Sequence, residues 1–123
     1  MDKRPVNLDL STVKFPVTAI ASILHRVTGV VLLAGVLILL WALDQSLSSQ
    51  EGFDFIKELL ANVLVKLVVW AILAAVIYHF VAGVRHLFMD LGFWEELESG
   101  KASATVTIAL SVVLIALAGV WLW

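Results

Sequence analysis

The 123-residue chain contains no cysteine. This absence excludes disulfide bonds, iron–sulfur clusters held by thiolates, zinc–thiolate sites and the covalent attachment of haem through Cys-x-x-Cys-His. Charged residues are also scarce, at 15% of the chain, with 8 lysines and arginines against 10 aspartates and glutamates. Because no basic block is interleaved with aromatic residues, nucleic acid is not an expected partner. Any metal must be held by histidine or carboxylate, or arrive inside a non-covalent cofactor.

Apolar residues are abundant, at 62% of the chain, and the mean hydropathy is +1.04. Such a chain has too little polar surface to coat a water-soluble globule, so the bilayer is its predicted solvent. The uncharged runs Val27–Leu43, Leu67–Val84 and Ala104–Trp123 contain 17, 18 and 20 residues. Each reaches or approaches the roughly 20 residues that carry a helix across the hydrocarbon core. Three transmembrane helices follow.

These runs predict an all-α membrane protein with one membrane-anchor domain over residues 1–123 and spans at about residues 17–43, 64–87 and 103–123. The first helix should begin near Val17, because Pro16 suits a first turn and no breaker follows. A helix over residues 17–43 is about 40 Å long, so its apolar start should project from the membrane core and need cover by a soluble partner. Residues 48–62 are expected to form an amphipathic helix that leads into the second span.

Basic residues in the loops indicate the orientation, because lysine and arginine are retained on the cytoplasmic side. Six of them flank the spans on the N-terminal side and two flank them on the other: Lys3, Arg4, Lys14, Arg26, Arg85 and Lys101 against Lys57 and Lys66. We therefore predict a multi-pass membrane protein with a cytoplasmic N-terminus and an external C-terminus.

A polar cluster in the first span is the first candidate site. Ser22, His25, Arg26 and Gly29 follow one another at i, i+3, i+4 and i+7 and therefore share a helix face. One interpretation is structural, with Arg26 reaching the headgroups and Ser22 bonding to its own helix. The other is a pocket for a ligand with acceptor oxygens, such as a quinone carbonyl or a carboxylate, because arginine and serine both donate hydrogen bonds.

The second candidate site contains His79, which lies about 10 Å inside the end of the second span at His86. An imidazole at that depth needs a partner. A polar side chain on a neighbouring helix, a proton or ion pathway, and the iron of a haem all remain open. Gly83, one turn further on, would let a flat macrocycle approach the helix. Haem propionates would find basic and imidazole partners toward the end of the span, on His25, Arg26, Arg85 and His86. His86 and Asp90 are spaced as a helix-end pair.

The third span carries few polar residues, and we expect it to serve as scaffold. Ala109, Ala116 and Gly119 are its expected close-packing positions.

These motifs together resemble the cytochrome b subunits of bacterial succinate dehydrogenase. The resemblance runs nearly end to end and rests on three segments: residues 4–10 (RPVNLDL), residues 22–29 (SILHRVTG), and residues 79–90, which read His-x-x-x-Gly-x-Arg-His-x-x-x-Asp.

The resemblance implies specific roles for these residues. His79 would be one axial ligand of haem b, with the second ligand supplied by another small anchor subunit. Ser22 and Arg26 would line a ubiquinone site beside the iron–sulfur subunit, and His25 and Arg26 would lie on the haem propionate side.

The resemblance also implies the partners. The chain would be an anchor in the bacterial inner membrane that passes electrons from the iron–sulfur subunit to ubiquinone, as part of a larger helix bundle with the second anchor subunit. Flavin and iron–sulfur clusters would reside only in the flavoprotein and iron–sulfur subunits. Alternative functions are the anchor of a fumarate reductase, a purely structural membrane anchor and a small proton or ion transporter.

Overall fold

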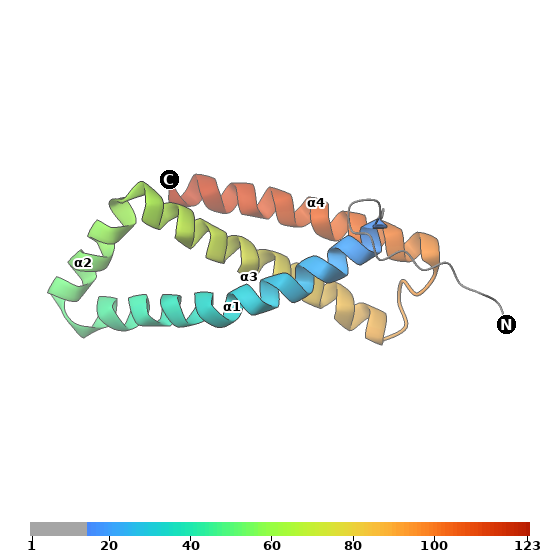
Figure 1. Cartoon of the computed structure of the whole chain (residues 1–123), viewed down its shortest axis with the longest axis horizontal. Helices are drawn as coiled ribbons and strands as arrows, with labels where there is room; N and C mark the ends of the chain where they lie inside the picture. Colours follow the sequence, from blue (N-terminus) through green and yellow to red (C-terminus); the bar gives the residue numbers. More distant parts are fainter. Residues whose placement is uncertain (1–14) are drawn as a thin grey trace.

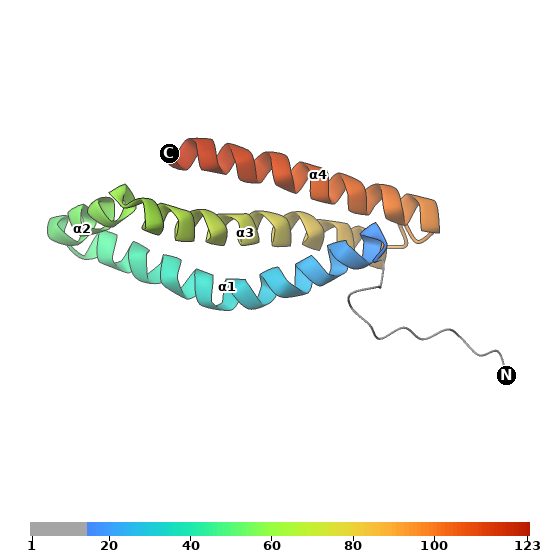
Figure 2. The same ribbon diagram turned by 45° about the horizontal axis from the view of Figure 1, so that its top comes forward.

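A computed structural model of the protein describes residues 15–123, which form four helices. They are α1 (Val17–Ser48), α2 (Gln50–Ala61), α3 (Val63–Asp90) and α4 (Leu97–Leu122). The three long helices run alongside one another, and α2 joins α1 to α3 at one end (Figures 1 and 2). Each long helix is long and apolar enough to cross a membrane. The prediction of an all-α membrane protein with three transmembrane helices is confirmed.

Three elements meet at the end of the bundle opposite α2: the start of α1, the end of α3 and the start of α4 (Figure 1). Both candidate sites predicted from the sequence lie toward this end, which we call the site end. Part of the sequence used in the predictions above lies outside the described residues 15–123, namely Lys3, Arg4, Lys14 and the segment 4–10.

The start of α1 agrees with the sequence prediction, and its end lies five residues beyond the predicted limit at residue 43. The carbonyl of Pro16 accepts the N–H of Ile20 at 3.1 Å, which fixes the first turn. No glycine or proline interrupts the helix after Leu43, and Ser46 Oγ donates to the Ala42 carbonyl at 2.7 Å. The extended backbone of Ser49 ends α1.

Side-chain caps start the next two helices. Ser49 Oγ accepts the N–H of Gly52 at 2.9 Å at the start of α2, the amphipathic helix expected from the sequence. Asn62 Oδ1 accepts the N–H of Leu64 at 2.8 Å at the start of α3. Each cap satisfies a backbone donor that the first helical turn leaves without an intrahelical partner.

Small residues allow α1 and α3 to approach closely. Ala21 and Gly35 of α1 are buried, as are Ala75 and Ala82 of α3. A Cβ added to Gly35 would lie only 3.0 Å from Ile72 Cγ2. Such positions are typical of helix contacts in membranes, where close van der Waals packing replaces the hydrophobic driving force.

The face of α4 that packs against the bundle differs from the predicted one. Its buried residues are Gly100, Ala104, Thr107 and Ser111. Ala109 and Ala116 are exposed, so their prediction as packing positions in this chain is wrong. Gly119 does pack closely, because a Cβ there would lie 3.1 Å from Trp70 Nε1. The helix is apolar on all sides, so hydropathy alone could not identify the packed face.

Candidate functional site

The three histidines of the chain meet between α1 and α3 at the site end. The rings of His25 and His79 stack with centroids 4.1 Å apart and planes 5° from parallel. The ring of His86 lies 4.7 Å from that of His25. The structure therefore brings the polar cluster of the first span to the deep histidine of the second. It also places His86 against His25, whereas the sequence predicted a helix-end pair with Asp90 or a position on the haem propionate side.

The Nδ1 atom of His79 has two partners on α1. It lies 3.1 Å from the carbonyl oxygen of His25 and 3.1 Å from Oγ1 of Thr28. The Thr28 hydroxyl itself donates to the His25 carbonyl at 3.0 Å.

These contacts determine the tautomer of His79. A carbonyl oxygen only accepts hydrogen bonds, so its contact with Nδ1 requires that Nδ1 carry the proton. We assign the single hydroxyl proton of Thr28 to the same carbonyl, 3.0 Å from Oγ1, and Oγ1 then accepts from Nδ1. We assign the proton of His79 to Nδ1 from these partners. The lone pair of the neutral ring then resides on Nε2, the nitrogen left for a further ligand.

Gly29 provides space for the stacked rings, and Gly83 borders them at ordinary contact distance. A Cβ at Gly29 would lie 3.2 Å from His79 Cε1, so this glycine allows the His79 ring to lie against α1. A Cβ at Gly83 would lie 3.8 Å from Nε2 of His25. In this chain the open side of Gly83 therefore faces the imidazole of His25, whereas the sequence prediction assigned that space to a macrocycle.

Ser22 and Arg26 lie in different surroundings although they are one turn apart. Ser22 is half-buried and lines a cavity of about 260 Å³ at the site end, together with Thr18, His86 and Glu95. Arg26 is exposed and does not line that cavity. The predicted polar face is therefore divided in this chain between a cavity and an open surface.

Arg85 does not join the histidines. It is buried and turns toward α4, where its Nε donates to Ser103 Oγ at 2.9 Å and its Nη2 donates to the Gly100 carbonyl at 3.3 Å. Its expected place on the propionate side rested on helix position alone. The small residues of α4, which the sequence analysis treated as scaffold, provide the acceptors that attract the side chain there.

Sequence reasoning also missed Thr28 as part of the site. Its position three residues after His25 was visible, because a threonine hydroxyl in a helix bonds back to a carbonyl three or four residues earlier. Its contact with His79 depends on the packing of α3 against α1, which no sequence pattern reported.

The chemistry open to this site is that of an imidazole ligand for a cofactor. Within residues 15–123 no group of three or more histidine, cysteine, aspartate or glutamate side chains is placed to hold a metal ion. The Nε2 atom of His79 suits a cofactor that brings most of its own metal ligands, and haem is such a cofactor.

Residues 1–118 match the model of the family described as "Succinate dehydrogenase/Fumarate reductase transmembrane subunit". The chain is 46% identical over 122 residues to the succinate dehydrogenase cytochrome b556 subunit of Coxiella burnetii, covering 98% of each chain. It is 35% identical over 111 residues to the cytochrome b556 subunit of Paracoccus denitrificans, covering 90% of this chain and 85% of that one. The cytochrome b560 subunit of Reclinomonas americana is 30% identical over 113 residues, with 88% and 78% covered.

Proposed function

Because the chain belongs to the family of succinate dehydrogenase and fumarate reductase transmembrane subunits, we propose that it carries one half of a haem b site and part of a ubiquinone site. As a membrane anchor of succinate dehydrogenase, it associates with the other subunits of that enzyme. The proposal assigns the haem and quinone roles to particular residues of this chain. The observation that carries it is the pair of hydrogen bonds at Nδ1 of His79.

The residues around His79 fit an axial haem ligand. Histidines that bind metals usually give their second ring proton to a carbonyl or carboxylate, which fixes the tautomer and the ring orientation. His79 does so toward the His25 carbonyl and Thr28, and Gly29 leaves room for its ring. A bound haem b would supply a one-electron carrier at this point. The second axial ligand would come from the second small anchor subunit.

The quinone site is proposed at Ser22 and Arg26. The Ser22 hydroxyl, beside the cavity of about 260 Å³, would donate to a ubiquinone carbonyl. Arg26 is exposed on the same end of α1, where the iron–sulfur subunit would cover it. Its guanidinium would donate either to the quinone or, together with His25, to the haem propionates.

The bilayer orientation is also a proposal. Of the basic residues in the described part, Arg26, Arg85 and Lys101 belong to the site end, and Lys57 and Lys66 belong to α2 and the start of α3. Retention of positive charge on the inner side favours a cytoplasmic site end of a bacterial inner membrane. The exposed Ile20, Ile23 and Leu24 of α1 would then face the iron–sulfur subunit, and the flavoprotein subunit would lie beyond it.

The haem ligand is tested with the complex purified after co-expression of all subunits. We expect His79→Ala to abolish or strongly shift the reduced-minus-oxidised spectrum of a b-type haem. His86→Ala serves as the matched control, because it removes an imidazole from the same cluster and should leave the spectrum in place. An unchanged spectrum in His79→Ala would show that His79 is not a ligand.

The quinone site is tested by comparing two electron acceptors. Ser22→Ala and Arg26→Leu should impair the reduction of ubiquinone by succinate, while succinate oxidation by a soluble artificial acceptor persists. Ser46→Ala, on the same helix toward α2, should leave both activities intact. An equal loss of both activities in the Ser22 and Arg26 variants would indicate failed assembly and contradict the assignment.

One observation favours a second candidate function, a purely structural anchor. The hydrogen bonds from His79 Nδ1 to α1 already give its imidazole a role in holding two helices together. The spectrum of His79→Ala decides between the two roles. An anchor that transfers electrons from quinol to fumarate is the remaining alternative, and the midpoint potential of the physiological quinone determines that direction.

A further inference from the structure

Arg85 is a buried charged residue, and its hydrogen-bond partners in the described part of the chain are neutral. Its side chain is 5% exposed, and in the described part of the chain it donates to a hydroxyl and to a backbone carbonyl. A guanidinium has five N–H donors, and these two contacts use two of them. An arginine inside a membrane protein normally faces a compensating anion or a pathway, because burying its charge is costly.

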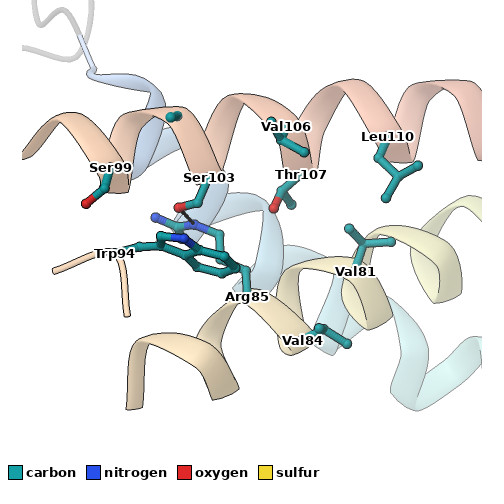
Figure 3. A pocket seen from close by; sticks show the side chains of 10 residues that line it. Val81, Val84, Arg85, Trp94, Ser99, Ser103, Val106, Thr107 and Leu110 are labelled. Carbon is teal, nitrogen blue, oxygen red and sulfur yellow. Dashed lines mark hydrogen bonds between the residues drawn. The ribbon is translucent and has the colours of Figure 1, made fainter. Parts of the chain in front are cut away.

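A cavity of about 390 Å³ opens beside this guanidinium, in a groove between α3 and α4. The groove changes in polarity along its length (Figure 3). Arg85, Trp94, Ser99 and Ser103 line its outer end, near the α3–α4 connection, and Val81, Val106 and Leu110 line its inner end. The groove therefore becomes more apolar with depth from the site end, with Thr107 as a polar side chain among the inner residues.

The depth of Arg85 matches the headgroup region of a bilayer. It precedes the end of α3 at Asp90 by five residues, which is about 8 Å along the helix. Trp94 follows in the connection, and tryptophan is enriched at the same level of membranes. Trp94 also has a φ of 60°, a left-handed conformation that is strained for a large side chain. Such strain persists where the surrounding structure requires one placement of the side chain, as at a ligand site.

We propose that this groove binds one phospholipid, with its phosphate on Arg85 and one acyl chain along Val81, Val106 and Leu110. The free N–H groups of Arg85 would donate to the phosphate oxygens, since a guanidinium matches phosphate geometry. The Ser99 and Ser103 hydroxyls line the same end of the groove and already donate to the Glu96 and Gly100 carbonyls. The inner apolar wall would contact the chain. The cavity volume lies within the range of ligand-binding pockets, about 300 to 1,000 Å³.

The charges at the mouth of the groove select among phospholipid headgroups. Glu95 and Glu96 line the adjacent cavity, which shares Arg85 and Trp94 with the groove. These carboxylates would repel a second negative charge on the lipid and attract an ammonium group. A phosphatidylethanolamine therefore fits better than a phosphatidylglycerol or a lipid with two phosphates.

The test uses the intact complex, purified in mild detergent and weighed by native mass spectrometry. Val106→Trp fills the inner groove and leaves Arg85 untouched. Val112→Trp is the matched control, because it makes the same substitution on the same helix at a position of similar exposure, 61% against 63%, outside the groove. We expect Val106→Trp to reduce the retained phosphatidylethanolamine about tenfold, equivalent to about 1.4 kcal/mol of binding free energy, and Val112→Trp to leave it unchanged.

The phosphate contact is tested with Arg85→Gln and Arg85→Lys. The glutamine variant should lose the lipid, and the lysine variant should keep part of it, because an ammonium still binds phosphate as a point charge. If Arg85→Gln prevents assembly of the complex, the comparison of the two tryptophan variants still decides. The haem and quinone assays proposed above should not respond to Val106→Trp, so the two proposals fail separately.

Three results would overturn the lipid proposal. The first is equal lipid retention in the wild type and Val106→Trp, and the second is preferential retention of phosphatidylglycerol. The third is a crosslink from Val106→Cys, in the otherwise cysteine-free chain, to another subunit in native membranes. That crosslink would show that a protein segment covers the groove.

Discussion

Replacing Thr28 by valine removes one hydrogen-bond acceptor from the proposed haem ligand, together with the hydrogen bond from the same hydroxyl to the His25 carbonyl. The two side chains have the same shape and both branch at Cβ, so the packing of α1 against α3 should be retained. The substitution removes Oγ1, which lies 3.1 Å from Nδ1 of His79, and leaves the His25 carbonyl at the same distance. His79 would then keep its tautomer and lose one of two acceptors.

The expected effect is a rise in the midpoint potential of the haem. An acceptor at Nδ1 increases the electron density at Nε2 and favours oxidised iron, so losing an acceptor favours reduced iron. One net hydrogen bond contributes about 1 kcal/mol. A tenfold change in an equilibrium constant corresponds to about 1.4 kcal/mol, or to about 59 mV for a one-electron couple. A hydrogen bond of about 1 kcal/mol can therefore raise the midpoint potential by at most about 40 mV. Since the His25 carbonyl remains, we expect a rise of about 20 to 40 mV.

The measurement is an optical redox titration of the purified complex in which the absorbance of the haem reports its oxidation state. Thr28→Ser should restore the wild-type potential, because it restores the oxygen. Thr105→Val is the matched control: that hydroxyl donates to the Lys101 carbonyl at 2.9 Å on the exposed side of α4, away from the histidines. A fall in potential in Thr28→Val, or an equal change in Thr105→Val, would refute the reasoning.

Three further substitutions test packing through the apparent melting temperature of the solubilised complex. Gly35→Ala should destabilise by about 1 to 3 kcal/mol, because its Cβ would lie 3.0 Å from Ile72 Cγ2; an unchanged melting temperature would mean that α1 and α3 do not pack this closely. Tyr78→Phe should cost about 0.5 to 1.5 kcal/mol by removing the hydrogen bond from its hydroxyl to the Ala21 carbonyl at 2.7 Å, and a gain in stability would contradict this. Ser111→Ala should leave the melting temperature equal or higher, because Ser111 Oγ is buried without a partner in the described part of the chain, so a clear fall would point to a partner elsewhere in the complex.

The sequence by itself determined the solvent, the number of spans and the family. The three long uncharged runs are predicted to be helices in a bilayer. In lipid, the backbone N–H and C=O groups of such a segment must form hydrogen bonds within the segment itself, and a helix allows this. The start of α1 at Val17 and the presence of α2 followed from Pro16 and from the spacing of apolar residues, which are local signals. The motifs around Ser22 and His79 identified the family, and the match over residues 1–118 confirms it.

Only the tertiary structure decided which polar side chains meet. The stacking of His25 on His79 and the contact of Thr28 with Nδ1 depend on the separation and rotation of α1 and α3, which Gly29 and Gly35 set through backbone approach. The turn of Arg85 toward Ser103 and the buried face of α4 likewise depend on packing. In helices that are apolar on every side, the sequence places a residue along the membrane normal, whereas contacts between helices determine the direction in which its side chain points.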